Sequence, residues 1–257
     1  MRFIECRQGT PEWLAARAGL CTASEFGTAC STVGSLTEQQ QKYVRGILVS
    51  NMTEKQAAEF AGYKAPPTAE AVKRALKGED TETMSDTALR YAHDLAFERI
   101  SGAPYGEPPK TWLLQRGHDL EDEARRLYVG EKGYFVREAG ICVDDEGFGY
   151  STDGLVEIME SGDHGLLEIK NPIDSVKITR IWKTHDLDEY SHQHQGGMWL
   201  TGRKWIDHVM YAPALESRGK HLYMHRVMRD DDFIDRMVKR LAIFQAKVDE
   251  IVHTLSS

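Results

Sequence analysis

Cysteine is scarce in this sequence. Only four cysteines occur among 257 residues, and no two of them have the CxxC spacing of a zinc ribbon. A disulfide framework is equally unexpected, because stapled secreted domains are rich in cysteine. The sequence therefore predicts a protein of a reducing cytoplasm. The cysteines are Cys6, Cys21, Cys30 and Cys142.

Long apolar runs are also missing. The sequence contains no stretch of the roughly 18 consecutive apolar residues that a membrane-spanning helix needs. The first residues, MRFIECRQGTPEW, lack the apolar segment of a signal peptide. No long internal repeat is visible. We therefore expect no membrane partner.

The sequence also has no excess of positive charge. The formal net charge is −8, which argues against a protein that coats nucleic acid through bulk positive charge. An enzyme that binds DNA locally stays open, because a metal site concentrates acidic residues while cations can lie elsewhere. Hydrophobic residues make up 41% of the chain and charged residues 28%, enough for a sizeable core and a hydrated surface. Composition thus predicts an acidic, soluble enzyme.

Hydrophobic periodicity predicts a mixed α/β fold. Short helices should begin at Thr10-Pro11 and near Thr22-Ala23-Ser24, where capping residues precede apolar ones. Beyond them the apolar period switches between helical and strand values, which predicts a central mixed sheet flanked by helices. The longer helices are expected over 84–100, 110–130, 187–201 and 231–255, and the strands over 134–143, 148–158, 165–171, 205–212 and 220–228.

Two of these helices have a clear apolar face. A stripe at alternating spacings of three and four predicts core packing for the last helix, with a coiled coil as the alternative. In the helix over 110–130, the face consists of Leu120, Ala124, Leu127 and Tyr128. In the last helix, it consists of Ile234, Met237, Leu241, Phe244, Val248, Ile251 and Leu255.

Residues 36–80 have a different character. Capping boxes at Thr37 and Thr53 start two helices, and Gly62 can end the second one before a third begins after Pro66-Pro67. Three short helices with sharp turns resemble a helix-turn-helix unit. We therefore predict an inserted helical segment, with one core formed by residues 1–35 and 81–257.

The insertion has two interpretations. The stretch TEKQAAEFAGY resembles the helical DNA-binding part of phage terminase small subunits. The DNA phosphates would then be contacted by Lys55, Lys64, Lys73, Arg74 and Lys77. Alternatively, the segment packs against the core or forms a subunit contact. Its own apolar members are expected to be Tyr43, Val44, Ile47, Leu48, Ala57, Phe60, Val72 and Leu76.

The strand over 165–171 carries charged residues in an apolar context. Side chains alternate in direction along a strand, so Glu168 and Lys170 project from one face and Ile169 from the other. An acid and a lysine side by side on an otherwise apolar strand suggest a polar site in a cleft. A surface salt bridge is the alternative explanation.

Asp153 provides a second acidic group. It is followed by glycine, and an Asp-Gly pair most often marks a turn. The flanking residues are strand-like, however, so we expect Asp153 at a kink beside the strand of Glu168. The two carboxylates, together with the backbone carbonyl of Ile169, offer the oxygen ligands that Mg²⁺ prefers.

A third acid comes from the helical segment RGHDLEDEA, residues 116–124. Most acidic residues on a helix are hydrated, and we expect this of Asp122 and Glu123. Glu121 differs because it borders the apolar face of its helix. It can therefore point into the same cleft.

The segment YSHQHQGGMW, residues 190–199, is expected to be helical and places Gln193 ahead of two glycines. Glycine costs about 1 kcal/mol inside a helix. The close approach of another backbone or of DNA would explain Gly196 and Gly197. The histidines have no matching set of cysteines or histidines, so we expect no zinc site.

Together these segments resemble the YqaJ-like viral recombinase and phage lambda exonuclease family of the PD-(D/E)xK nuclease superfamily. The matching segments cover residues 8–30 and about 115–212, and their order is more specific than any one of them. The sequence departs from the lambda-type pattern at 36–80 and at Asn171, where that pattern has a cysteine. The segments are Glu12-Trp13 through Arg17, Thr22-Ala23-Ser24, RGHDLEDEA, STDG, LEIKNP and YSHQHQGGMW.

The resemblance implies a metal site and a fold. Asp153 and Glu168 would bind the metal with the help of the Ile169 carbonyl, and Glu121 would bind a second ion directly or through water. The implied cofactor is Mg²⁺, as two ions, with Mn²⁺ as a substitute. The implied fold is a restriction-endonuclease-like α/β core, a central mixed sheet flanked by helices, with a small helical insertion.

The resemblance also implies roles for other side chains. Lys170 would orient or activate the attacking water, and Gln193 would position Lys170 or the scissile phosphate. Arg17 and Ser24 match the positions that bind the terminal 5′-phosphate. An arginine fork and a hydroxyl at a helix N-terminus are physically suited to an anion.

The implied activity is metal-dependent 5′-to-3′ digestion of linear double-stranded DNA, which exposes 3′ single strands for homologous recombination. The implied partners are DNA ends, a single-strand annealing protein and two further copies in a homotrimer. The expected location is the cytoplasm of a bacterium or a phage-infected host.

Two alternatives are weighed against this activity. An endonuclease or a Cas4-like nuclease of the same superfamily is one, although the scattered cysteines argue against a Cas4-like iron–sulfur cluster. A non-catalytic DNA-binding protein is the other. The intact set of Glu121, Asp153, Glu168 and Lys170 argues against it.

Overall fold

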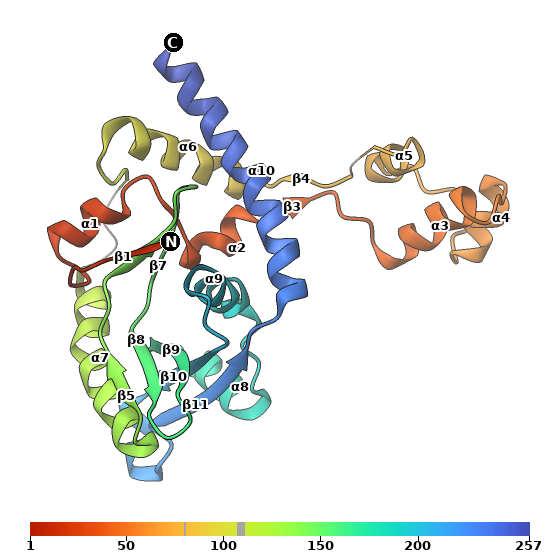
Figure 1. Ribbon diagram of the computed structural model, residues 1–257. Helices are drawn as coiled ribbons and strands as arrows, with labels where there is room; N and C mark the ends of the chain where they lie inside the picture. The colour runs from red at the N-terminus through yellow and green to blue at the C-terminus, as the bar shows by residue number, and fades with distance from the viewer. Residues whose placement is uncertain (80, 107–110) are drawn as a thin grey trace. The chain divides into compact units, whose positions relative to one another are not determined.

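The computed structural model describes residues 1–79, 81–106 and 111–257 (Figure 1). The chain divides into two compact units, one of Met1–Ala29 with Tyr91–Ser257 and the other of Cys30–Arg90. Residue 80, the last of the predicted insertion, and residue 110, the first of a predicted helix, lie outside the described residues. None of the helices within the described ranges is long and apolar enough to cross a membrane.

A five-stranded mixed sheet lies at the centre of the larger unit. Its strands are β5 (Phe135–Arg137), β8 (Gly154–Ile158), β9 (Asp163–Lys170), β10 (Trp205–Tyr211) and β11 (Leu222–Met228). The strand order is β11-β10-β9-β8-β5. Only the pair β9–β10 is parallel, among the pairings described for this sheet, and the others are antiparallel. The predicted central mixed sheet is therefore confirmed.

A second, four-stranded sheet explains why two predicted strands are interrupted. It has the order β1-β6-β7-β2, with β1 (Arg2–Ile4), β2 (Cys21–Thr22), β6 (Ile141–Val143) and β7 (Phe148–Ser151). The predicted strands 134–143 and 148–158 each run from one sheet into the other. The first one breaks at Gly140, where an added Cβ would lie 2.0 Å from the carbonyl oxygen of Ile4. The second one breaks at Thr152-Asp153.

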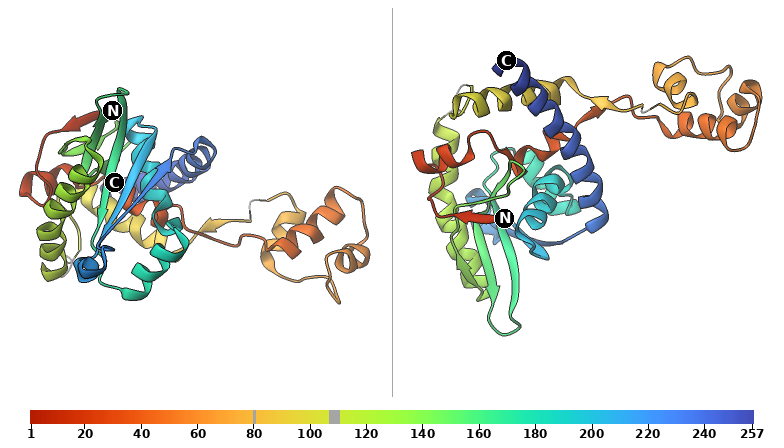
Figure 2. Two further views of the ribbon diagram at one scale, coloured as in Figure 1. Left: turned by 90° about the horizontal axis from the view of Figure 1, so that it is seen from below. Right: turned by 45° about the horizontal axis from the view of Figure 1, so that its top comes forward.

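Helices cover both faces of the five-stranded sheet. Figures 1 and 2 show α7 (Thr111–Lys132) along one face, and α8 (Ser175–Thr184) and α9 (Ser191–Thr201) on the opposite side. Ala124 and Tyr128 of α7 are buried against Leu167, Ile169 and Val209. Because strand side chains alternate, Glu168 and Lys170 lie on the face covered by α9. The apolar face predicted for α7 is confirmed, since Leu120 and Leu127 also pack on this cluster.

The helix α8 was not predicted. Asp174 caps it by accepting hydrogen bonds from the backbone N–H groups of Val176 (2.8 Å) and Lys177 (3.3 Å). Its sequence is rich in β-branched residues, which have low helix propensity, although Ile178, Ile181 and Trp182 do recur at a helical spacing and pack together. The predicted helix 187–201 begins instead with the 3₁₀ turn η2 (Asp188–Tyr190), before α9.

The remaining elements of the larger unit surround the two sheets. The predicted apolar stripe of the last helix is buried at every position but Leu255, which is exposed in the final turn. These elements are α1 (Pro11–Arg17), η1 (Ala23–Glu25), α2 (Phe26–Ala29), α6 (Asp86–Ser101, which begins in the smaller unit), η3 (Pro213–Arg218) and α10 (Asp231–Ser256).

The smaller unit contains the predicted three-helix segment. Its elements are β3 (Thr32–Val33), α3 (Glu38–Leu48), α4 (Glu54–Phe60), α5 (Glu70–Leu76) and β4 (Thr83–Met84). Both predicted capping boxes are present, at Thr37 and Thr53. The unit extends beyond 36–80 because β3 pairs with β4 and joins the two connecting segments.

The core of this bundle is built partly from small residues. Ala58 and Ala61 are buried and were not predicted. Leu48 and Phe60 are 52% and 59% exposed, so their prediction as core residues was wrong. Both lie at the last residue of a helix, and the small alanines face inward in place of Phe60. The other predicted members lie in the core cluster, namely Tyr43, Val44, Ile47, Ala57, Val72 and Leu76.

Candidate active site

Asp153 lies where the chain passes from β7 to β8. The hydroxyl of Thr152 accepts a hydrogen bond from the backbone N–H of Gly154 (3.2 Å) and lies 3.1 Å from the carbonyl oxygen of Leu167. The break therefore stays attached to β9. The carboxylate of Asp153 accepts a 2.6 Å hydrogen bond from the backbone N–H of Ile169. This bond places Asp153 next to Glu168, at the kink expected from the sequence.

Glu168 is the most buried acid of the site, at 3% exposed. One carboxylate oxygen accepts hydrogen bonds from the ammonium of Lys170 (2.7 Å) and the side-chain amide of Gln193 (2.5 Å). The other oxygen accepts a 3.0 Å hydrogen bond from the hydroxyl of Tyr150. Burial, followed by the charge of Glu168, raises the pKa of Tyr150 well above its ordinary value, so the hydroxyl stays a donor.

The acids of the site repel one another. Burial, followed by the charges of Glu168 and Glu121, raises the pKa of Asp153 well above its ordinary range. Burial alone would lower the pKa of Lys170, but Glu168 and Asp153 outweigh it and raise that pKa above its ordinary value. The two neighbouring carboxylates therefore favour the charged ammonium form of Lys170.

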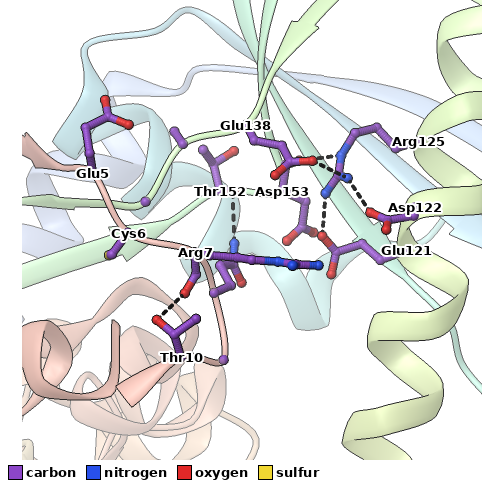
Figure 3. Close-up of a pocket in the computed structure, with 14 residues that line it drawn as sticks. Glu5, Cys6, Arg7, Thr10, Glu121, Asp122, Arg125, Glu138, Thr152 and Asp153 are labelled. Atoms are coloured by element: carbon purple, nitrogen blue, oxygen red, sulfur yellow. Dashed lines mark hydrogen bonds and ion pairs between the residues drawn. The ribbon is translucent and has the colours of Figure 1, made fainter. Parts of the chain in front are cut away.

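Glu121 reaches the site from α7, one turn before Arg125. The Arg125 guanidinium donates a 2.5 Å hydrogen bond to the carboxylate of Glu121 and a 3.0 Å hydrogen bond to the backbone carbonyl of Asp153. Figure 3 shows the carboxylates of Glu121 and Asp153 pointing toward each other. Glu121 therefore contributes a third acid to the cluster, as expected.

Arg17 and Ser24 lie together on the other side of the cleft. The Arg17 guanidinium packs 4.6 Å from the ring centre of Trp13 and donates a 3.1 Å hydrogen bond to the hydroxyl of Thr22. That hydroxyl lies 3.2 Å from the hydroxyl of Ser24. Trp13 is held in turn by a 2.8 Å hydrogen bond to Ser151, which adjoins the kink. The arrangement combines a cation and two hydroxyls, which suits an anion.

One cleft of about 260 Å³ brings all of the predicted site residues together. Gln8, Trp13, Thr22 and Tyr150 also line it. A larger cavity of about 580 Å³, shown in Figure 3, adjoins it and shares Gln8, Glu121 and Asp153. The predicted residues in the cleft are Arg17, Ser24, Glu121, Asp153, Glu168, Ile169, Lys170 and Gln193.

The donor set fits divalent cations. The carboxylates of Glu121, Asp153 and Glu168 meet here beside the ammonium of Lys170, and burial, followed by the charges of the other two acids, raises the pKa of Asp153. Carboxylate and carbonyl oxygens are the ligands that Mg²⁺ prefers. Across the described ranges, no three acidic, imidazole or thiol side chains form a ready cluster for a metal ion. The protein's own donors, Lys170, Gln193 and the Ile169 N–H, hold the oxygens of Glu168 and Asp153 instead.

The glycines of α9 have a different explanation from the one expected. An added Cβ at Gly196 would lie 2.5 Å from the ring of Phe26, and one at Gly197 would lie 2.6 Å from the ring of Tyr150. Aromatic side chains, rather than another backbone or DNA, therefore approach these glycines. Gly197 matters to the site because it makes room for the ring whose hydroxyl holds Glu168.

The histidines beside Gln193 pack inside the protein. His194 is buried and its Nε2 lies 3.1 Å from Nδ1 of His208, while His192 packs against Phe233. Burial lowers the pKa of His194 to about 3. The imidazoles of His194 and His208 therefore form a buried pair in the core.

The sequence did not single out Tyr150, Thr22 or Arg125 as contributors. Tyr150 and Thr22 lie inside segments that the sequence had already marked, two or three residues from a predicted site residue. Arg125 follows Glu121 by one helical turn, the spacing at which side chains meet. Spacing could thus have suggested all three, but not their partners.

Comparison with known proteins places this site in a family context. The sequence matches the family model of the YqaJ-like viral recombinase domain over residues 12–204. No curated protein sequence matches it significantly. The matched range includes every predicted site residue and continues through the inserted helices.

Solved structures give a consistent result. An alkaline exonuclease from Laribacter hongkongensis, LHK-Exo, is 27% identical over 96% of both chains, with a TM-score of 0.66. The same protein in complex with dAMP gives a TM-score of 0.67 at the same identity and coverage. A phage-related exonuclease from Haemophilus somnus 129PT shares the fold at 18% identity, over 74% of this chain and 90% of that one, with a TM-score of 0.54. The predicted PD-(D/E)xK nuclease-like α/β fold is confirmed.

Proposed function

Since this chain belongs to the YqaJ-like viral recombinase family, we propose that it is a metal-dependent exonuclease that digests linear double-stranded DNA from 5′ to 3′. The exposed 3′ strands would serve homologous recombination. We also propose that it acts in the cytoplasm with a single-strand annealing protein and as a homotrimer, as the family implies. The structural likeness to LHK-Exo, an alkaline exonuclease, supports the exonuclease class.

The observation that carries the proposal is the shared cleft. Residues from α1, η1, α7, β9 and α9, and from the break between β7 and β8, meet in one space of about 260 Å³. Acids lie at one side of it and the pair Arg17–Ser24 at the other. A DNA end can therefore place its terminal phosphate on Arg17 while the neighbouring phosphodiester lies beside the acids.

The residues divide the chemistry among themselves. Asp153, Glu168 and Glu121 would hold two Mg²⁺ or Mn²⁺ ions with the Ile169 carbonyl, and bound ions of this kind acidify the attacking water and neutralise the leaving 3′-oxygen. Lys170 stabilises the negative charge that develops on the phosphate. The neighbouring carboxylates of Glu168 and Asp153 favour its charged form.

The supporting side chains restrict movement. Gln193 and Tyr150 hold Glu168 from α9 and β7, so the carboxylate cannot rotate freely. Arg17 would bind the 5′-phosphate in a fixed orientation, because Trp13 supports the guanidinium and Thr22 accepts one of its N–H groups. The cleft is thus preorganised for one end of a strand.

A digestion assay tests the proposal against its alternatives. Linear and circular duplexes of equal sequence would be incubated with Mg²⁺, with Mn²⁺ and with chelator. Digestion of linear DNA alone, dependent on metal, is the expected result. Cutting of circles would favour the endonuclease or Cas4-like alternative, and binding without any cutting would favour the non-catalytic DNA-binding protein. End-labelled strands would report whether the 5′ end is consumed first.

Arg17→Ala should remove most of the preference for 5′-phosphorylated ends. Among the described residues that line the cleft, Arg17 is the cation on the side of Ser24. Hydrogen bonds to charged groups contribute about 1.5–3 kcal/mol, so we expect roughly a tenfold to hundredfold smaller preference. The measurement is the ratio of digestion rates on 5′-phosphate and 5′-hydroxyl duplexes. An unchanged ratio would remove Arg17 from end recognition, and Arg236→Ala on the exposed face of α10 is the control.

The inserted bundle is predicted to contribute little to DNA affinity. Lys73 lies 3.4 Å from Glu70 and Arg74 lies 3.8 Å from Glu79, so local acids offset two of the three cations. Replacing Lys73, Arg74 and Lys77 together by alanine should therefore change duplex binding less than about threefold, because exposed ion pairs contribute only about 0–1 kcal/mol. Binding would be measured over a series of salt concentrations. A clear loss of affinity with a flatter salt dependence would instead support the DNA-contact interpretation.

A further inference from the structure

Arg125 uses its whole guanidinium to tie α7 to the kink that carries Asp153. Besides Glu121 and the Asp153 carbonyl, it donates hydrogen bonds to Asp122 (2.8 Å) and Glu138 (3.1 Å). Its side chain is 14% exposed, whereas those of Asp122 and Glu138 are 64% and 69% exposed. Figure 3 shows the guanidinium between these acids at the wall of the larger cavity.

Arg125 makes two inner contacts, with Glu121 and Asp153, which differ in kind from its two outer contacts at the protein surface. Glu121 and Asp153 come from separate elements, a helix and an interrupted strand, and both line the cleft. Arg125 is bonded to the side chain of one and the backbone of the other. Asp122 and Glu138 lie at the surface, where ion pairs contribute about 0–1 kcal/mol. The inner contacts therefore determine how far Glu121 lies from Asp153.

We propose that Arg125 is a positioning residue that sets the spacing of Glu121 and Asp153 for divalent-ion binding. This inference rests on the proposed metal-dependent function. Arginine suits the role because its planar fork donates in several fixed directions at once, which lysine cannot do. It also places a positive charge beside Glu121, which reduces the repulsion between the acids.

The contacts of Arg125 predict an effect on metal affinity rather than on turnover. Residues that orient metal ligands typically change metal affinity by about 10–100-fold when they are replaced. Arg125 contacts two proposed ligands and does not line the smaller cleft itself. Its loss should therefore raise the Mg²⁺ concentration needed for half-maximal cleavage, while saturating Mg²⁺ restores much of the rate.

The experiment compares Arg125→Ala and Arg125→Lys with Glu138→Gln, which removes one outer contact. Mn²⁺ binding would be measured by calorimetry, cleavage rate as a function of Mg²⁺, and melting temperature for every variant. We expect both Arg125 variants to bind Mn²⁺ about tenfold or more weakly, with Arg125→Lys the milder of the two. Glu138→Gln should match the wild type in ion binding and cleavage.

The outcomes separate this inference from the proposed function. One outcome is that the wild type binds Mn²⁺ and cleaves DNA while the Arg125 variants bind Mn²⁺ as tightly as the wild type does. In that case Arg125 has only a structural role, whether or not the variants melt at a lower temperature. If the wild type cleaves DNA without metal, the proposed function fails and the inference fails with it. A weaker metal affinity in both Arg125 variants, with Glu138→Gln unaffected, supports the positioning role.

Discussion

Glu168→Gln is expected to lower DNA cleavage by at least about a thousandfold while the protein stays folded. The carboxylate is 3% exposed and lies at the centre of the site, where Tyr150, Lys170 and Gln193 converge on it. Glutamine has nearly the same shape and can still accept hydrogen bonds. It lacks the negative charge that would hold a divalent cation, so the loss falls on chemistry rather than on packing.

Cleavage and melting temperature would be measured on the same preparation of this variant. The control is Asp163→Asn, which removes a carboxylate charge at the exposed start of the same strand. It should behave like the wild type. Near-normal digestion by Glu168→Gln would refute the assignment of the metal site. Asp153→Asn provides a second, independent removal of a proposed ligand charge and should have a similar effect.

Lys170→Met is expected to lower the turnover number by about a hundredfold to a thousandfold and to spare metal binding. The ammonium donates to Glu168 at 2.7 Å and is held in its charged form by the neighbouring acids. Its positive charge is therefore available to a developing phosphate charge but cannot serve as a metal ligand. Methionine preserves most of the side-chain length and its apolar packing.

Two measurements decide the role of Lys170. Single-turnover cleavage at saturating DNA and Mg²⁺ reports the chemical step, and Mn²⁺ calorimetry reports the metal site. Lys183→Met, at an exposed position of α8, is the control and should be unaffected. Lost metal affinity combined with unchanged cleavage would show that the assigned role is wrong.

Much of the site could be predicted because strand and helix periods fix the direction of side chains. Alternation along β9 predicts that Glu168 and Lys170 share a face and that Ile169 faces the opposite helix, and the structure confirms this arrangement. The border position of Glu121 on α7 likewise predicts that it turns toward the cleft. These inferences need only local geometry, which the sequence encodes directly.

The partners of these side chains could not be predicted in the same way. Arg125 contacts Asp153, 28 residues away along the chain, and Gln193 contacts Glu168, 25 residues away. Such contacts depend on how helices cross the sheet. The reason for Gly196 and Gly197 also depends on tertiary packing, because aromatic rings from α2 and β7 fill the space beside them.

Strand continuity was the main error in the predicted fold. The apolar alternation of 134–143 and 148–158 continues through residues that belong to two different sheets. A pattern of side-chain directions contains no information about hydrogen-bond partners, so it cannot show where a strand changes sheets. The break at Asp153 is nevertheless where the site forms, because it frees the backbone to orient the carboxylate toward β9.

The pairing of β3 with β4 determines how freely the segment between them can vary in length and sequence. Thr32 is the direct partner of Met84 and Val33 that of Thr83, so the chain leaves and returns at neighbouring points. The entropy lost in closing a loop grows only logarithmically, by about 0.6 kcal/mol for each doubling of length. Once these strands are paired, a longer, shorter or different segment between them costs the protein little free energy. We therefore expect this position to accept the exchange of one module for another, which makes it a suitable point for grafting a foreign domain.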